Sequence, residues 1–410
     1  MSIQAGPRDG AGAQRTADIA GFRGFAALTV VVFHAWQFCR AGGHPDFAGT
    51  TTGRLLGGFD GIISWFFVTS AFLLYAPVAR RLLTGQDPGS ARGFLLRRVL
   101  RVLPVYWVAV LVVWAYRNPS LPGDWRDLVE HLTFIETFDS KRIFYTIGPA
   151  WTLSVEVAFY LFVALYLAVV RRAVSWGARR PVLLLAAPAA LLLVASTGYR
   201  VTEVATGTSL LRWAVWFNPL GWAGDFALGM LLALVVAVRG GRPLSGLSLR
   251  GLRLVTAVIV VGALFLVHDT PSSFVRFHSL TAVGYALLLG CSVLAPATSL
   301  WRAVLAWRPL VWVGTLSFSL YVWHEPLLLL LDRHGLVSHD PAAFPAVAIT
   351  LCLLGTGVGW LGYHVLELPL RNLGHLVAAD GRLAAYYPAR SGTLDAGAAD
   401  VPEVLVHAKR

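Results

Sequence analysis

The sequence predicts an all-α membrane protein, a bundle of about ten transmembrane helices with both termini in the cytoplasm. Hydrophobic residues make up 56% of the 410 residues and charged residues only 14%, whereas about 25% of a soluble domain is charged. Apolar runs recur along the chain at the length of about 20 residues that a helix needs to cross the hydrocarbon layer. Lys and Arg gather in alternate connecting segments, and the positive-inside rule then places the N-terminus in the cytoplasm.

Ten apolar runs define the expected spans and the domain boundaries. The runs are residues 22–40, 61–78, 99–116, 150–170, 181–197, 216–238, 254–268, 279–296, 310–331 and 344–367. They lack the alternation over about ten residues that marks a barrel strand. We expect a ten-span domain over residues 18–373, preceded by a disordered cytoplasmic segment, residues 1–17. Residues 374–410 are polar and rich in Ala and Gly, so we expect a disordered cytoplasmic tail.

Composition excludes several other classes of protein. The net charge is +12, but the basic residues lie between apolar runs, not on a domain with base-stacking aromatics, so nucleic acid is not an expected partner. Cys39, Cys291 and Cys352 are far apart in the sequence, which indicates neither a disulfide framework nor a zinc cluster. The first apolar run lacks the pattern of a cleaved signal peptide, and we expect it to remain as the first span.

Three ionisable residues are expected inside the outer half of the bilayer, where each costs roughly 2.5 to 3.5 kcal/mol to insert. They are His34, Glu156 and His324, and the helical rise places all three about 10 Å below the outer surface. We expect the carboxylate of Glu156 to pair with the imidazole of His34. The alternative for each is a hydrogen bond that only bridges two helices. Asp225, in another span, fits packing or proton balance as well as chemistry.

Arginines mark the cytoplasmic ends of two spans. Arg23 precedes His34 by eleven residues, so the two share a helix face about 16 Å apart. Arg98 and Arg101 lie one turn apart at the inner end of the third span. Snorkelling to lipid phosphate explains any one of these arginines alone. Three converging guanidinium groups would bind a polyphosphate. A nucleotide carrier that is held there and has a flexible arm reaching about 16 Å to His34 fits the description of acyl-coenzyme A.

At these residues the chain resembles the acyltransferase 3 family of ten-span membrane acyltransferases, relatives of the bacterial O-antigen and lipopolysaccharide O-acetyltransferases. The similarity covers residues 18–373 and rests on several stretches in order: FRGFAALTVVVFH, WFFVTSAFLL, RRVLRVLPVYW, WTLSVEVAFYL, LSFSLYVWHEPLL and LELPLRNL. Many members have an aspartate where this chain has Ser64 and a serine-glycine pair where it has Ser70 and Ala71. The family also includes enzymes that acylate macrolide antibiotics, so the resemblance implies an acceptor hydroxyl on either a carbohydrate or a glycosylated secondary metabolite.

The resulting hypothesis is a multi-pass enzyme of the bacterial inner membrane that transfers an acetyl or short acyl group from acyl-coenzyme A, without a metal. His34, oriented by Glu156, is the expected general base. Arg23, Arg98 and Arg101 are expected to hold the phosphates of the coenzyme. His324 either polarises the thioester carbonyl or positions the acceptor.

Direct transfer is the simpler route because the chain has no Gly-x-Ser-x-Gly elbow, although Ser70 and Ser154 stay open as nucleophiles. The rival from another class is a proton-coupled transporter or a lipid or glycan flippase, with His34, Glu156 and Asp225 as a proton relay. No inverted repeat supports a transporter. A metalloenzyme is disfavoured, because no two histidines stand three or four residues apart.

Overall fold

The computed structural model describes residues 8–40, 50–120, 122–266, 269–296 and 298–377, and this part of the chain is helical without strands. The helices are α1 (Arg8–Arg40), α2 (Thr51–Gly57), α3 (Ile63–Leu83), α4 (Ala91–Arg117), α5 (Trp125–Leu132), α6 (Trp151–Ser175), α7 (Pro181–Ala205), α8 (Trp213–Trp216), α9 (Pro219–Val238), α10 (Gly246–Leu264), α11 (Pro271–Val293), α12 (Leu300–Leu305), α13 (Arg308–Thr315), α14 (Ser317–Arg333), α15 (Phe344–Gly362) and α16 (Leu368–Val377). Short 3-10 helices are η2 (Gly58–Ile62), η3 (Glu136–Phe138), η4 (Gly148–Ala150) and η5 (Pro341–Ala343), and a π-helix, η6 (Tyr363–Glu367), joins α15 to α16.

The expected all-α membrane architecture is confirmed. Within the described residues, nine helical segments are long and apolar enough to cross a membrane. α1 begins at Arg8, before the expected domain start at residue 18, and α16 runs past the expected end at residue 373. Residues 1–7 and 378–410, on which the rest of the expected terminal segments falls, lie outside the described part.

The expected span 310–331 is not one helix. It consists of α13 and α14, which are separated at Leu316 with φ −101° and ψ 8°. The hydroxyl of Ser317 donates to the carbonyl of Gly314 at 2.9 Å, and such side-chain bonds to backbone compete with a continuous helix. The apolar run therefore contains a break that hydropathy alone does not reveal.

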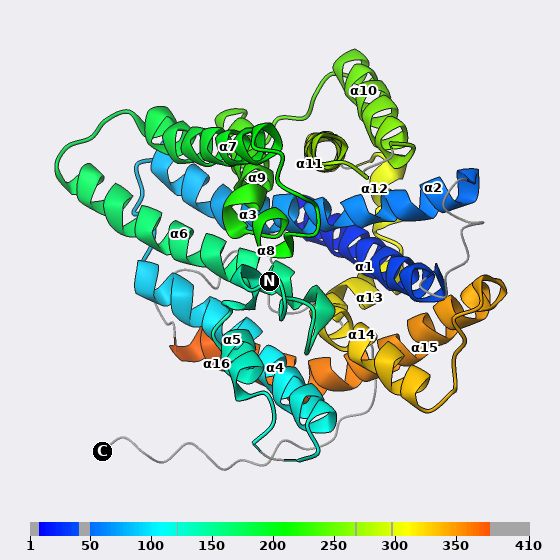
Figure 1. The fold of residues 1–410 in the computed structure, drawn as a ribbon. Helices are drawn as coiled ribbons and strands as arrows, with labels where there is room; N and C mark the ends of the chain where they lie inside the picture. Colours follow the sequence, from blue (N-terminus) through cyan, green and yellow to red (C-terminus); the bar gives the residue numbers. More distant parts are fainter. Residues whose placement is uncertain (1–7, 41–49, 121, 267–268, 297, 378–410) are drawn as a thin grey trace, which may run out of the picture. The chain divides into compact units, whose positions relative to one another are not determined.

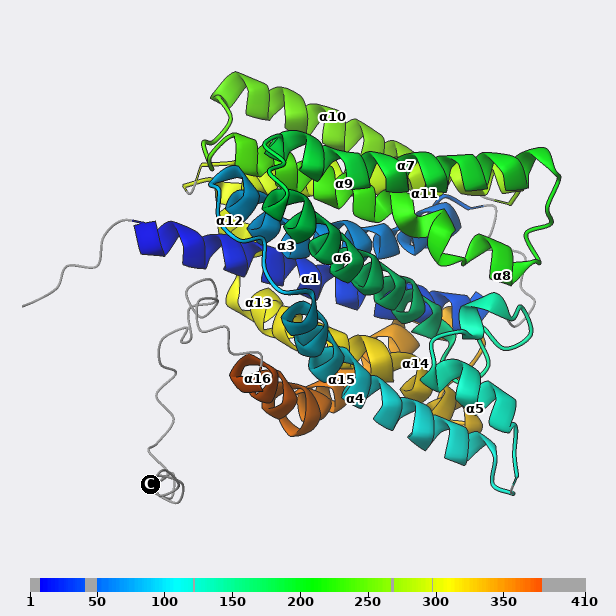
Figure 2. The ribbon, with the colours of Figure 1, turned by 90° about the vertical axis from the view of Figure 1, so that its left-hand side faces the viewer.

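The helices are arranged around α1 and α3. In two views at right angles, α7, α9, α10 and α11 lie on one side of these central helices, and α4, α14, α15 and α16 lie on the other (Figures 1 and 2). The closest packing joins α3 to α9, α7 to α9, α1 to α13 and α14 to α15. α1 also packs against α14, so it contacts both halves of the broken span.

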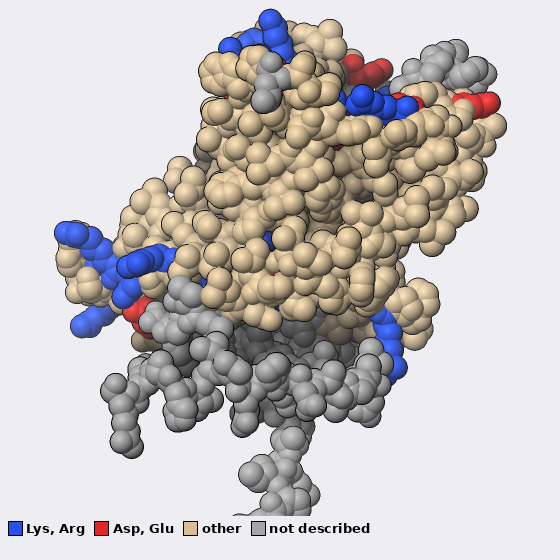
Figure 3. Space-filling view, turned by 90° about the horizontal axis from the view of Figure 1, so that it is seen from below, with Lys and Arg blue, Asp and Glu red and all other residues tan. Residues whose placement is uncertain are grey.

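The bundle has two distinct ends. We call the end where α3 stops and α4 starts the arginine-rich end, because Arg80, Arg81, Arg92, Arg97 and Arg98 lie there. The segment between α4 and α6 lies at the opposite end. On the face that carries α4 and α15, charged side chains gather toward these two ends and leave a broad, almost uncharged band between them (Figure 3). Such a band suits contact with lipid.

Candidate active site

α1 and α13 approach each other closely, and this sets the position of Arg23. A Cβ atom on Gly24 would lie 2.1 Å from the carbonyl oxygen of Leu310, and one on Gly314 would lie 1.8 Å from that of Ala20. Only glycine permits this contact between backbones. Arg23 then donates from Nη2 to Oγ of Ser317 at 3.0 Å, the first residue of α14.

The three expected phosphate-binding arginines converge near the arginine-rich end. The guanidinium carbon of Arg98 lies 5.8 Å from the ring centroid of Tyr160 on α6, and the charges of Arg98 and Arg101 both act on this tyrosine. Arg101 in turn repels Arg23. The Nε of Arg98 is buried and has no hydrogen-bond partner among the described residues. Like charges and an unpaired buried donor together make a site that an anion would stabilise.

Two carboxylates face the same arginines. Glu156 accepts a hydrogen bond of 2.5 Å from Ser70 of α3, and Glu367 of the π-helix accepts one of 3.0 Å from Ser319 of α14. Both carboxylates attract Arg23. Partial neutralisation of Arg23 by these carboxylates offsets its repulsion by Arg101.

Glu156 does not have the partner that we expected from the sequence. Its hydrogen bond goes to Ser70, and no contact in the described part joins it to His34. One turn earlier on α6, Thr152 is bonded to the hydroxyl of Tyr321 at 2.8 Å. Thr152 and Glu156 share one face of α6, so Tyr321 of α14 lies next to this face, and the carboxylate of Glu156 is bonded to α3.

The partner of His34 is His324. The two imidazole rings, from α1 and α14, lie edge to face with centroids 5.0 Å apart. His324 is fully buried, and its Nδ1 lies 2.6 Å from the carbonyl oxygen of Tyr321. A carbonyl can only accept, so Nδ1 carries the proton and Nε2 of the neutral ring has a free lone pair. That Nε2 is buried and has no partner within the described residues.

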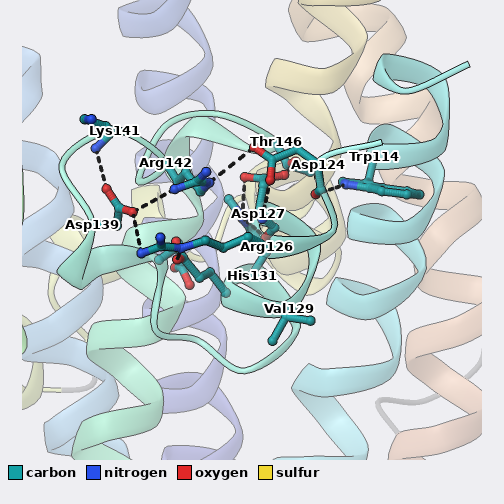
Figure 4. Close-up of polar contacts among 12 residues, drawn as sticks. Trp114, Asp124, Arg126, Asp127, Val129, His131, Asp139, Lys141, Arg142 and Thr146 are labelled. Carbon is teal, nitrogen blue, oxygen red and sulfur yellow. Dashed lines mark hydrogen bonds and ion pairs between the residues drawn. The ribbon is translucent and has the colours of Figure 1, made fainter. Parts of the chain in front are cut away.

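At the opposite end, the segment from Asp124 to Thr146 forms a network of polar contacts, which we call the polar cap (Figure 4). Asp127 is central to it, since its carboxylate accepts from Thr146 and lies 3.1 Å from Nδ1 of His131. The cap is tied to the bundle because the hydroxyl of Tyr106 on α4 donates to the carbonyl of His131 at 3.0 Å. A second tie joins Glu136 to Ser154 on α6.

Two groups of this cap have shifted pKa values. Burial raises the pKa of Glu136 to about 7, although the nearby His131 and the bond from Ser154 oppose the shift. Burial disfavours the charged form of His131, but the hydrogen bond to Asp127 and the charges of Glu136 and Asp127 outweigh it and raise the pKa of this histidine. We did not select these residues from the sequence, because they lie in a segment of mixed charge that reads as an ordinary loop.

Other site residues were also missed by sequence reasoning. Glu325, next to His324, accepts from the backbone N–H of Gly148 at 2.7 Å and so links α14 to the start of α6. Ser317 and Glu325 both stand in the stretch LSFSLYVWHEPLL, which would have pointed to them. Asp225 lies apart from the site, 3.9 Å from Arg200 of α7. In the described chain it has no contact that would extend a proton relay from His34 or Glu156.

The sequence is similar to those of known membrane acyltransferases. The family model described as acyltransferase domain, acyltransferase 3, matches residues 16–364. Acyltransferase MdmB of Streptomyces mycarofaciens is 26% identical, over 88% of this chain and 92% of MdmB. Exopolysaccharide production protein ExoZ of Rhizobium meliloti is 27% identical, over 75% of this chain and 88% of ExoZ.

Longer relatives match as well. Peptidoglycan O-acetyltransferase OatA of Listeria monocytogenes is 25% identical over 87% of this chain. The chain spans 56% of the length of OatA and 54% of that of a relative from Bacillus subtilis. No solved structure gives a significant match.

Proposed function

Because the chain belongs to the acyltransferase 3 family, we propose that it is a membrane O-acyltransferase that moves an acetyl or other short acyl group from acyl-coenzyme A to a hydroxyl. The acceptor is a carbohydrate or a glycosylated metabolite. The names of OatA and ExoZ, which refer to peptidoglycan and exopolysaccharide, support a glycan acceptor. The observation that carries the proposal is the arrangement along α1, with a cluster of arginines at Arg23 and an imidazole pair at His34.

The arginine cluster is the proposed binding site for the coenzyme. Arg23, Arg98 and Arg101 bind the phosphates, and the unpaired Nε of Arg98 becomes one of the donors. Glu156 is a positioning residue, whose charge holds Arg23 toward Ser70 and Tyr160. By the positive-inside rule the arginine-rich end faces the cytoplasm, where acyl-coenzyme A is made. The arm of the coenzyme then runs beside α1 over about 16 Å to the imidazole pair.

The imidazole pair is the proposed base. His34 removes the proton of the acceptor hydroxyl as its oxygen attacks the thioester carbonyl. The new C–O bond forms, the C–S bond breaks, and the proton passes from His34 to the leaving thiolate to give free coenzyme A. The tautomer of His324 is fixed by the carbonyl of Tyr321, so its free Nε2 can accept a hydrogen bond from His34 during the reaction, which would leave the other nitrogen of His34 unprotonated. His324 thus takes the orienting role that we had expected for Glu156.

The test uses purified protein in lipid nanodiscs with radiolabelled acetyl-coenzyme A and glycan acceptors. We expect binding of acetyl-coenzyme A and transfer of label, and we expect transfer to be lost in His34→Ala while binding remains. Absence of binding to the wild-type protein would favour a transporter, which needs no acyl donor. Equal transfer by His34→Ala and the wild type would exclude the imidazole as the base.

A further inference from the structure

A groove of about 500 Å³ lies between α4, α14 and α15. Most of its walls are apolar, with Val112 from α4, Leu327 and Leu330 from α14, and Val358 from α15. Val112 is 52% exposed and Leu330 is 39% exposed. Val112 lies in a segment that is long and apolar enough to cross a membrane, Ala91–Arg117, so the groove opens sideways, where lipid surrounds a membrane protein. Its volume is in the range of about 300 to 1,000 Å³ that is usual for ligand pockets.

Two arginines line the same groove at the ends of their helices. Arg117 is the last residue of α4 and Arg333 the last of α14. Arg333 lies over the ring of Tyr116 at 4.5 Å and donates to the carbonyl of that residue at 3.4 Å. Within the described chain neither arginine lies within ion-pair distance of a carboxylate. A hydrocarbon groove with two positively charged guanidinium groups at one end is complementary to an amphiphile with an anionic head, and arginine favours phosphate.

The groove and the proposed imidazole pair share α14. Trp323, which lines the groove, precedes His324 in α14, and Pro326 lines it one turn further on. The charge of Arg117 acts on Glu325, the residue that follows His324. Side chains of a helix lean toward its N-terminus, so both arginines lean along their helices toward the histidine layer. Arg333 follows His324 by nine residues of α14, a rise of about 14 Å, so a head group of two or three sugars would span the distance from a phosphate held there to the imidazole pair.

We propose that this groove binds the acceptor, and that the acceptor is a lipid phosphate whose head group carries the hydroxyl. The hydrocarbon chain lies against Val112 and Leu330, the phosphate is bound by Arg117 and Arg333, and the hydroxyl reaches His34. This inference rests on the proposed acyl transfer and names its acceptor class. Donor and acceptor then enter from different directions, the coenzyme from the arginine-rich end and the lipid sideways out of the bilayer.

Binding is tested first with a simple probe, hexadecyl phosphate, on the full-length protein by native mass spectrometry. We expect the wild type to retain hexadecyl phosphate at least about tenfold more strongly than hexadecanol, which lacks the phosphate. Arg117→Gln with Arg333→Gln should remove this difference. Arg212→Gln is the matched control, since Arg212 is an exposed arginine at the same end of the bundle that does not line the groove. Equal retention of both probes, or an equal loss in the control, would overturn the phosphate site.

The acceptor role is tested in cells of the source organism with a photo-crosslinking residue in place of Leu330. We expect the captured molecule to be a lipid phosphate, and its mass to rise by one acetyl group when acetyl-coenzyme A is supplied. Capture of only the bulk phospholipids, unchanged by acetyl-coenzyme A, would overturn the proposal. The wild-type assay with free acetyl-coenzyme A runs in parallel, so a failure of this acceptor assignment is distinguished from a failure of acyl transfer itself.

Discussion

The imidazoles of His34 and His324 face each other edge to face, with ring centroids 5.0 Å apart, although 290 residues of sequence separate them. α1 brings the first and α14 the second, and the same two helices are joined again by the hydrogen bond from Arg23 to Ser317. One pair of helices thus carries both the proposed donor site and the proposed base. The break before α14 is what allows its first residue to meet Arg23.

His324→Asn tests whether acyl transfer needs the lone pair on Nε2 of His324, because it removes that lone pair and keeps the hydrogen bond to Tyr321. The amide nitrogen of asparagine replaces Nδ1 and keeps the bond to the carbonyl of Tyr321, while the Nε2 position is lost. We expect the rate of acyl transfer to fall by about 10² or more, with the affinity for acetyl-coenzyme A unchanged. The measurement is single-turnover transfer beside equilibrium binding. His364→Asn is the matched control, because the Nδ1 of His364 also bonds a backbone carbonyl, that of Trp360, at 2.9 Å, but on an exposed side chain.

Arg98→Gln tests the anion site. A lost hydrogen bond to a charged group costs about 1.5 to 3 kcal/mol, so we expect acetyl-coenzyme A to bind roughly 10-fold to 100-fold more weakly, with little change in the rate at saturation. Calorimetry in nanodiscs measures the affinity. Arg92→Gln, on the exposed first turn of the same helix, controls for the general loss of positive charge. If both variants weaken binding equally, Arg98 acts only through long-range charge.

The sequence predicted well what is local to one helix. Arg23 and His34 share a face because the residue spacing and the helical repeat determine it, and both contact α14 as a result. The partners across helices were harder to predict. Glu156 was assigned to His34 by depth alone, but its carboxylate accepts from Ser70 of α3 instead. Depth follows from composition and length, whereas the rotation of one helix against another depends on packing that hydropathy does not encode.

Substitutions of Ser70 and Glu156 test whether an acyl-enzyme forms. Because we propose direct transfer, Ser70→Ala should lower the rate by less than about tenfold, roughly the worth of one hydrogen bond. Glu156→Gln should mainly weaken binding of acetyl-coenzyme A, since its charge positions Arg23. The measurement is transfer by each single variant and by the double variant, in which the two losses should not add. Label that stays on the wild-type protein and disappears in Ser70→Ala would show instead that the serine is a nucleophile.

The polar cap should open more readily as the pH rises. The pKa of Glu136 is about 7 in the folded cap against an ordinary 4.5, so the folded cap holds a proton that the open cap releases. The raised pKa of His131 acts in the same direction. The free energy of opening therefore falls between pH 4.5 and 7 for Glu136, and falls further as His131 loses its proton. Hydrogen exchange of residues 124–147, corrected for the intrinsic rate, should show protection that drops by up to about tenfold per pH unit for each proton.

Glu136→Gln provides the control for this pH dependence. Glutamine keeps an acceptor for Ser154 but has no proton to release, so the dependence below pH 7 should flatten. The contribution of His131 should remain at higher pH. Protection that increases with pH in the wild type would contradict the assigned direction of both shifts.

Gly24→Ala tests whether the close approach of α1 and α13 holds the donor site together. The added methyl group would meet the carbonyl oxygen of Leu310 at 2.1 Å, so the helices must separate, at a cost of about 1 to 3 kcal/mol. We expect a lower unfolding temperature in detergent and, because Arg23 moves from Ser317, weaker binding of acetyl-coenzyme A. Gly357→Ala is the matched control: Gly357 also lies within a helix, α15, but a Cβ there meets nothing within 4 Å. That variant should be as stable as the wild type or more so, because alanine favours helix by about 1 kcal/mol over glycine. If Gly24→Ala keeps both its stability and its affinity for the coenzyme, the contact between the two helix backbones does not position Arg23.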